Sequence, residues 1–218
     1  MGYLLQIVLL FFSFDLYGEN EIGSPTDIDW PSNNYTLNGQ RFVPVDQINK
    51  SNAVELERVC SLSVVESGTF QTNILHVDGL LYFTTPFESF AVDSSSCEVV
   101  WKHDHRKHFP MSSTAEVNQG MAYANGRIFR GTPDGWLLAL NAKSGKPIWE
   151  HQTGDPLAGE SFNGAPQTFQ GLVIIGAGNG NKGVGGRVMA YEAATGREVW
   201  RYTLTPRKES GGDSSTQG

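Results

Sequence analysis

Hydrophobic and polar positions follow the same pattern three times along this chain. A turn pair, Asp-Gly, Asn-Gly or Gln-Gly, precedes an apolar run in the segments 78–83, 125–129 and 170–175. Each apolar run is followed by a second strand-like run, a polar turn and a segment that ends in tryptophan. These tryptophans, Trp101, Trp149 and Trp200, lie 48 and 51 residues apart. Turn pairs with positive φ and short apolar runs indicate antiparallel hairpins. The repeat therefore predicts an all-β protein, a β-propeller of four-stranded antiparallel blades.

The closing segments of the three units align with one another, and all of them end on the tryptophan. They are Phe90–Trp101, Leu138–Trp149 and Met189–Trp200. Two roles are open to the repeated indole, a wedge between neighbouring blades or a contact to a cofactor. Because the residue recurs in every unit, core packing is the favoured interpretation.

A glycine-dense insertion at 176–186 separates the third unit from the other two. From the turn glycine to the tryptophan there are 22, 23 and 29 residues in the successive units. Glycines between buried strands let the backbone approach a ligand closely, whereas the alternative is a long hairpin loop. The insertion lacks the Gly-Lys-Ser/Thr ending of a phosphate-binding loop.

The two ends of the chain differ from the repeats. Residues 3–14 are apolar, too short to span a bilayer but suited to the core of a signal peptide. We predict a signal peptide at 1–18 and export to the periplasm, with a buried segment or a mis-assigned start codon as alternatives. The predicted organisation continues with an N-terminal extension at 19–56, a partial propeller at 57–206 and a polar tail at 207–218.

Charge and the rarer residues narrow the function classes. A net charge of −7 without a long basic cluster gives no basis for nucleic-acid binding. The only two cysteines, Cys60 in the strand-like stretch 56–65 and Cys97 at a turn, either form one disulfide or are unrelated buried thiols. His103 and His105 suggest a metal pair, but their place at a blade rim favours a solvated face.

The units resemble those of the PQQ-dependent alcohol dehydrogenases, the eight-bladed quinoproteins, over residues 29–206. The resemblance includes an opening segment at 30–56 and the landmarks Val117–Tyr123 and Gly164–Pro166. It implies about three to four blades of an eight-bladed ring. It also implies the cofactor PQQ on the propeller axis with a Ca²⁺ or lanthanide ion, an alcohol or sugar substrate, and a periplasmic electron acceptor.

Carried over position by position, the family's site falls on altered residues. The predicted cofactor-binding residues are Gln71, Ser113, Thr114, Gln119, Asn163, Gly178, Asn179 and Gly180, and the predicted metal ligand is Asn181. Ser113 and Thr114 replace the adjacent cysteines of the family. Amides replace charged groups at Gln71, Gln119 and Asn181, and neutral amide oxygens bind a hard dication more weakly than carboxylates do.

Two functions follow from this comparison. The first is part of a PQQ quinoprotein dehydrogenase, incomplete and inactive alone, since the family's catalytic aspartate corresponds to a position beyond Gly218. No catalytic residue is therefore predicted within the chain. The second is a non-catalytic propeller of the same repeat that serves as a binding or scaffold module. The retained glycine-rich insertion favours the first, and the lost charges favour the second.

Overall fold

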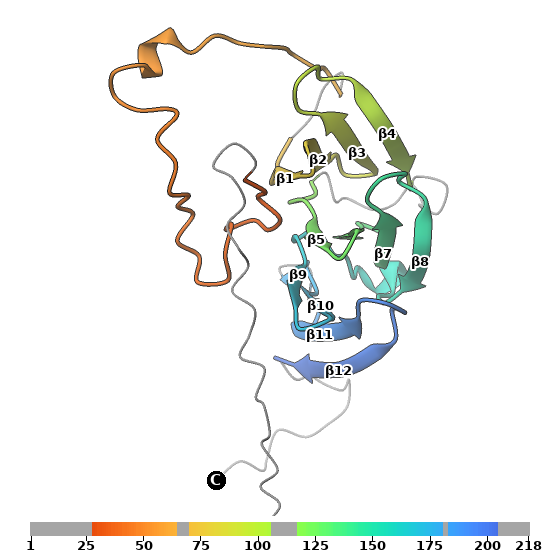
Figure 1. Ribbon diagram of the computed structural model, residues 1–218. Coiled ribbons are helices and arrows are strands. Elements are labelled where there is room, and N and C mark those ends of the chain that lie inside the picture. Colours follow the sequence, from red (N-terminus) through yellow and green to blue (C-terminus); the bar gives the residue numbers. More distant parts are fainter. Residues whose placement is uncertain (1–27, 65–69, 106–116, 181–182, 205–218) are drawn as a thin grey trace, which may run out of the picture.

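Three four-stranded antiparallel sheets form the body of the protein (Figure 1). The computed structural model describes residues 28–64, 70–105, 117–180 and 183–204. Within each sheet the strands follow one another in chain order, as expected for propeller blades. We call the sheets blade 1, blade 2 and blade 3. Blade 1 consists of β1 (Leu75–Val77), β2 (Leu80–Thr84), β3 (Glu88–Asp93) and β4 (Val99–Asp104); blade 2 of β5 (Ala122–Ala124), β6 (Arg127–Gly131), β7 (Trp136–Asn141) and β8 (Pro147–Gln152); blade 3 of β9 (Gln167–Phe169), β10 (Leu172–Gly176), β11 (Arg187–Glu192) and β12 (Glu198–Thr203). The predicted all-β propeller class is confirmed.

Each blade begins with the tight hairpin that the turn pairs predict. In blade 1, Asp78 and Gly79 have φ values of 51° and 75°, and the flanking Val77 pairs with Leu80. Asn125 and Gly126 adopt the same conformation in blade 2, with φ values of 49° and 73°. Two successive residues with positive φ produce a turn whose twist matches that of the paired strands.

The repeated tryptophan joins each blade to the next. Trp101 on β4 donates its indole N–H to the carbonyl of Ala142 in blade 2 at 2.7 Å, and Trp149 on β8 donates to that of Ala193 in blade 3 at 3.1 Å. Trp101 and Trp149 are 8% and 9% exposed, whereas Trp200 on β12 is 40% exposed. Trp101 and Trp149 therefore pack one blade against the next, as the sequence predicts.

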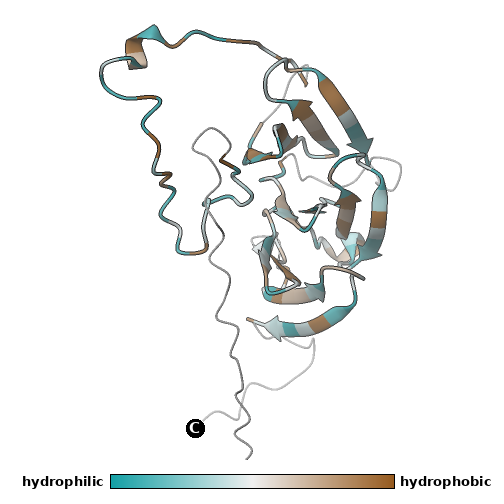
Figure 2. Ribbon diagram, viewed as in Figure 1, coloured by the Kyte–Doolittle hydropathy of each residue, from teal (hydrophilic) through white to brown (hydrophobic). Residues whose placement is uncertain are grey.

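The hydrophobic core lies in the two junctions between blades, and the blade strands carry hydrophobic stretches (Figure 2). The first cluster packs blade 1 against blade 2 and contains Leu75, Tyr82, Trp101, Ile128 and Leu138. The second packs blade 2 against blade 3 and contains Phe129, Leu137, Trp149, Val173 and Met189. Alternate residues of β6 and β7 thus face opposite junctions, because successive side chains of a strand point to opposite faces.

The segment 28–64 runs outside the blades for most of its length (Figure 1). Trp30 forms an isolated antiparallel bridge with His76 of β1, and a short 3₁₀ turn, η1, covers Ala53–Glu55. The predicted strand-like structure around Cys60 is wrong, since residues 56–64 contain no strand. Leu56 and Val59 there are 62% and 81% exposed, so these apolar side chains pack against no sheet.

A disulfide ties this segment to blade 1. Cys60 is bonded to Cys97 across 37 residues, with their Cα atoms 6.0 Å apart. Cys97 occupies the turn between β3 and β4 with a φ of 60°. Of the two alternatives left open by the sequence, the structure has the disulfide. It attaches the later part of this segment, residues 56–64, which contain no strand, to blade 1.

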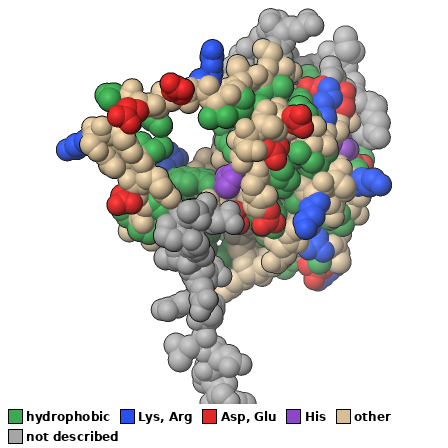
Figure 3. Space-filling model, turned by 45° about the horizontal axis from the view of Figure 1, so that its top comes forward, with side chains coloured by type: hydrophobic (Ala, Val, Ile, Leu, Met, Phe, Trp, Pro, Cys, Tyr) green, Lys and Arg blue, Asp and Glu red, His purple; other side chains and the backbone are tan. Residues whose placement is uncertain are grey.

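The predicted signal peptide at 1–18 and the polar tail at 207–218 lie outside the described residues. The predicted N-terminal extension is described from residue 28 onward, and the predicted propeller is described up to residue 204. Within those described ranges, no helix is long and apolar enough to cross a membrane. Acidic and basic side chains are interspersed on the face shown in Figure 3.

Candidate functional site

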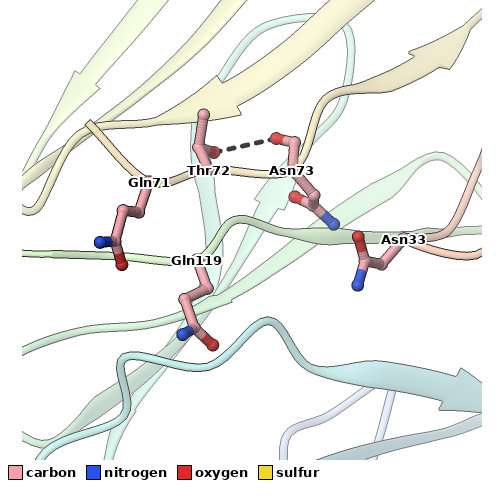
Figure 4. A pocket seen from close by; sticks show the side chains of 5 residues that line it. All are labelled: Asn33, Gln71, Thr72, Asn73 and Gln119. Carbon is pink, nitrogen blue, oxygen red and sulfur yellow. Dashed lines mark hydrogen bonds between the residues drawn. The ribbon is translucent and has the colours of Figure 1, made fainter.

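A polar cleft lies where the chain enters the innermost strands of blades 1 and 2. It has a volume of about 320 Å³ and is lined by Asn33, Gln71, Thr72, Asn73 and Gln119. Figure 4 shows the side chains of Gln71 and Gln119 on the same side of the cleft, with Asn33 and Asn73 farther along it. Two residues predicted from the sequence to contact a cofactor are thus brought together.

Backbone hydrogen bonds connect the entry segments of all three blades. The N–H of Asn73 donates to the carbonyl of Gln119 at 3.0 Å, and the N–H of Gln119 donates to the carbonyl of Asn163 at 2.7 Å. Gln119 and Asn163 are therefore direct neighbours, and Gln71 lies two residues from the first bond. We call this arrangement the amide row: Gln71, Gln119 and Asn163.

The side chain of Asn73 fixes the spacing of the amide row. Its amide nitrogen donates to the carbonyl of Met121 at 3.1 Å, and its oxygen accepts from the N–H of Met121 at 3.0 Å. Gly120 has a φ of 115°, and a Cβ there would come within 1.6 Å of Asn73 Oδ1. The glycine of the Asn118-Gln119-Gly120 landmark is required for this close approach.

A buried hydrogen-bond network supports the cleft from behind. The hydroxyls of Thr72 and Thr84 lie 3.1 Å apart, Thr84 donates to Asn118 Oδ1 at 2.8 Å, and Asn118 donates to the carbonyl of Gly131 at 2.9 Å. Sequence reasoning did not assign roles to Thr72, Asn73 or Asn118. Asn118 lies in the landmark Val117–Tyr123, which marked it for attention. The network itself could not be predicted, because it depends on contacts between segments that are distant in the sequence.

Asn163 offers an acceptor that the described part of the protein does not use. Its Oδ1 is buried and accepts no hydrogen bond from the described residues. Ser161 Oγ is also buried and forms no hydrogen bond with them. Buried polar atoms are costly to leave unsatisfied, so a bound polar ligand at this end of the amide row would satisfy them.

The glycine-rich insertion packs beside the segment that carries Asn163. Gly178 donates its N–H to the carbonyl of Ser161 at 2.8 Å, and the side chain of Asn179 donates to the carbonyl of Gly159 at 2.8 Å. A Cβ at Gly178 would lie 3.2 Å from Ser161 Oγ, whereas Gly180 has open space. Of the remaining predicted site residues, Ser113, Thr114 and Asn181 lie outside the described residues.

The described lining of the cleft is neutral. It consists of amides and a hydroxyl, which can donate to and accept from the oxygens of a flat polar cofactor. It supplies no carboxylate among the described residues, and Ca²⁺ and lanthanide ions prefer anionic oxygen ligands. The described residues therefore fit hydrogen bonding to a quinone cofactor and do not fit a hard cation.

The chain is similar in sequence to dehydrogenases that use PQQ. The family model described as the β-propeller domain of glucose, ethanol and alcohol dehydrogenases that use PQQ matches residues 30–218. Quinohemoprotein alcohol dehydrogenase ADH IIB of Pseudomonas putida is 36% identical over 182 residues, covering 82% of this chain and 26% of that protein. The dehydrogenase subunit of the quinone alcohol dehydrogenase of Gluconacetobacter polyoxogenes is 34% identical over 198 residues, covering 86% and 27%.

Solved structures agree with the sequence comparison. The structure of quinohemoprotein alcohol dehydrogenase ADHIIG from Pseudomonas putida HK5 matches with a TM-score of 0.77 and 32% identity, over 88% of this chain and 29% of that chain. A europium-containing methanol dehydrogenase matches with a TM-score of 0.72 and 29% identity, over 83% and 32%. The chain thus spans between about a quarter and a third of the length of these relatives.

Proposed function

Because the chain belongs to the PQQ β-propeller family of glucose, ethanol and alcohol dehydrogenases, we propose that it forms part of a quinoprotein dehydrogenase that oxidises an alcohol or a sugar. The observation that carries this proposal is the amide row. Gln119 and Asn163, from the segments that enter blades 2 and 3, are joined by a backbone hydrogen bond, and Gln71 lies two residues from Asn73, whose N–H donates to Gln119. PQQ, when bound, would supply a two-electron acceptor for the substrate.

The residues of this chain would bind and orient the cofactor. Gln71 and Gln119 offer amide N–H donors and carbonyl acceptors to its polar edge, and Asn163 offers the buried oxygen. The backbone of Gly178, Asn179 and Gly180 would form the wall beside Asn163. We assign this chain one wall of the site and no catalytic residue.

A metal ion has weaker support than the cofactor. The described lining holds no carboxylate, and the position of the family's metal-binding glutamate carries Asn181. We therefore derive no step through Ca²⁺ or a lanthanide.

A titration of the full chain with PQQ tests the proposal, with quenching of tryptophan fluorescence as the signal. We expect saturable quenching, and we expect Gln119→Ala to weaken binding roughly tenfold, the size of one or two lost hydrogen bonds. Gln152→Ala is the matched control, because Gln152 is an exposed amide on the outermost strand of blade 2.

The neutral lining favours a second candidate, a propeller that binds partners without quinone chemistry. Absence of quenching would support this scaffold function and contradict the first proposal. Saturable quenching with equal affinity in Gln119→Ala and Gln152→Ala would contradict the amide row as the place where PQQ binds.

Export is a separate proposal, with cleavage near Gly18 and an acceptor of electrons in the periplasm. N-terminal sequencing of periplasmic protein checks it, and an intact Met1 would contradict the cleavage.

A further inference from the structure

Two histidines and a glutamate meet at the outer side of the junction between blades 1 and 2. His103 lies on β4, His105 follows β4 directly, and Glu150 lies on β8. Their ligand atoms all lie within 4.8 Å of one another, and His103 Nε2 is 3.9 Å from Glu150 Oε1. β4 and β8 are the outermost strands of their blades, so this cluster is separate from the cleft at the innermost strands (Figure 1).

Strand periodicity explains why these side chains converge. His103 and His105 are two and four residues after Trp101, and alternate residues of a strand share a face. Trp101 enters the junction with blade 2, where its indole reaches Ala142, so the histidines are directed to the same junction. On β8, Trp149 points to blade 3, and the next residue, Glu150, points the opposite way, toward blade 1.

The prediction that His103 and His105 lie on a solvated face is wrong. The side chain of His103 is 11% exposed and that of His105 is 2% exposed. The backbone N–H of His105 donates to the carbonyl of Phe87 at 3.0 Å, and this bond holds His105 beside the start of β3. The prediction failed because blade 2 covers the end of β4, so the blade rim is not exposed to solvent at this place.

A buried carboxylate lies against His105. Asp134 Oδ2 lies 3.2 Å from His105 Nε2, and the other carboxylate oxygen accepts a hydrogen bond from Thr132 Oγ1 at 2.5 Å. The Trp136 ring and the imidazole pack in a T-shaped arrangement, with ring centroids 5.9 Å apart. A carboxylate that holds one nitrogen of an imidazole fixes the ring so that the other nitrogen can bind a metal.

The donor set selects a class of ion. Two imidazole nitrogens and one carboxylate, with water in a fourth position, are a common zinc ligand set. Ca²⁺ and Mg²⁺ prefer all-oxygen sites, so the imidazoles disfavour them. Glu150 supplies a carboxylate ligand, and Asp134 places a second negative charge beside His105.

The geometry requires only small adjustment. Ligand atoms of a tetrahedral zinc site lie roughly 3.3 Å apart, given bonds of about 2.0 Å. Glu150, whose side chain is 25% exposed, is the ligand with the most room to move toward the histidines.

We propose that His103, His105 and Glu150 bind a zinc-class divalent cation that clamps blade 1 to blade 2, with Asp134 as a positioning residue. The ion takes no part in alcohol oxidation. It stabilises the folded chain because it binds both blades only when they are packed together.

A zinc titration of the metal-stripped full chain by isothermal calorimetry tests this proposal. We expect one equivalent to bind with a dissociation constant in the micromolar range or below, and the melting temperature to rise with Zn²⁺ concentration. His103→Gln and Glu150→Gln should each weaken binding at least tenfold. His151→Gln, which alters an exposed histidine on the same strand as Glu150, should leave the affinity unchanged.

The role of Asp134 needs a spectroscopic measurement. With Co²⁺ as the probe, the visible spectrum of Asp134→Asn should change in shape and the affinity should fall about 10- to 100-fold, as expected for a lost carboxylate behind a histidine ligand. If the Co²⁺ spectrum and the Co²⁺ affinity are unchanged in Asp134→Asn, Asp134 does not position His105.

Three outcomes would overturn the site itself. The first is no binding at a Zn²⁺ concentration 100-fold above a dissociation constant of about 1 µM. The second is equal Zn²⁺ affinity in His103→Gln and His151→Gln. The third is an equal rise of the melting temperature with Zn²⁺ in Glu150→Gln and the unaltered chain. If both cluster variants fail to fold, the Co²⁺ spectrum of the unaltered chain decides. Bands of a four-coordinate site support the proposal, and a spectrum of hydrated Co²⁺ contradicts it.

Discussion

Arg130 on β6 is fully buried between blades 1 and 2 and has a definite set of partners. Its guanidinium donates to the carbonyls of Glu88 and Pro86 at 2.7 and 2.8 Å and to Ser89 Oγ at 3.0 Å. Burial, opposed by the charges of Asp134 and Glu88, lowers the pKa of Arg130 to about 10. The side chain stays charged at neutral pH and satisfies carbonyls that the turn before β3 would otherwise leave buried.

Arg130→Met should destabilise the fold by about 3–5 kcal/mol, because it leaves these carbonyls without donors. Urea unfolding followed by tryptophan fluorescence measures the change. Arg197→Met is the control, since Arg197 is largely exposed and 3.7 Å from Glu192, and it should cost less than about 1 kcal/mol. Equal losses in both variants would contradict the role of the buried carbonyls.

Asp93 shows how a single turn residue makes stability depend on pH. Its Oδ1 accepts from the hydroxyl of Ser95 and from the N–H groups of Ser95 and Ser96, and these bonds lower the pKa of Asp93 to about 2. Since the folded pKa lies below the unfolded value, the contribution is present above about pH 4 and is lost as pH falls toward 2.

Asn141 occupies the same turn position in blade 2 and makes the same kind of bonds to Lys143 and Ser144 without a charge. Asp93→Asn should therefore fold normally but lose less stability than the unaltered chain between pH 4 and pH 2. Melting temperatures across this range measure the difference. Parallel pH profiles would show that Asp93 makes no such contribution.

At the scale of the element, the turn glycines have two distinct roles. Gly126 (φ 73°) and Gly145 (φ 67°) both adopt the left-handed conformation, but a Cβ at Gly126 meets nothing within 4 Å, whereas one at Gly145 would lie 2.5 Å from the ring of Trp101. The first glycine makes a hairpin turn, and the second lets the turn of one blade pack on the tryptophan of the preceding blade.

Gly126→Ala should therefore cost about 1 kcal/mol, the strain of positive φ alone. Gly145→Ala should cost about 3 kcal/mol, because overpacking against Trp101 adds to the strain. Denaturant unfolding of both variants gives the comparison. A difference below about 0.5 kcal/mol would mean that the ring moves aside without cost.

Across the whole molecule, the disulfide between Cys60 and Cys97 connects the irregular segment 56–64 to blade 1. A crosslink across 37 residues restricts the unfolded chain, and chain-entropy arguments give about 3–4 kcal/mol for a loop of this length. The segment has few other means of attachment, since its apolar residues are exposed.

Replacing both cysteines by serine should thus lower the unfolding free energy by up to about 3–4 kcal/mol, while the spectrum of the folded blades in circular dichroism stays the same. The measurement is chemical unfolding with and without a reducing agent. The double variant serves as the control, because the reducing agent should not affect it. An unchanged stability of the unaltered chain on reduction would contradict the prediction.

The blade was predictable from the sequence because its determinants are local. The pairs Asp78-Gly79 and Asn125-Gly126 specify hairpins through backbone conformation alone, and alternation around Trp101 specifies which face enters a junction. The strand-like stretch 56–64 forms no strand, because it has no neighbouring strand to pair with. Local pattern describes a strand's faces but cannot supply its partner.

The sequence by itself determined the repeat, the hairpins, the place of the tryptophans and the residue types available for a cofactor. Only the tertiary structure decided which of these residues meet. Asn73, Gln119 and Asn163 are joined across blades, and His103 reaches Glu150 only because blade 2 packs on blade 1. The physical reason is that such contacts join residues more than 40 positions apart, whose proximity depends on the packing of whole blades rather than on local conformation.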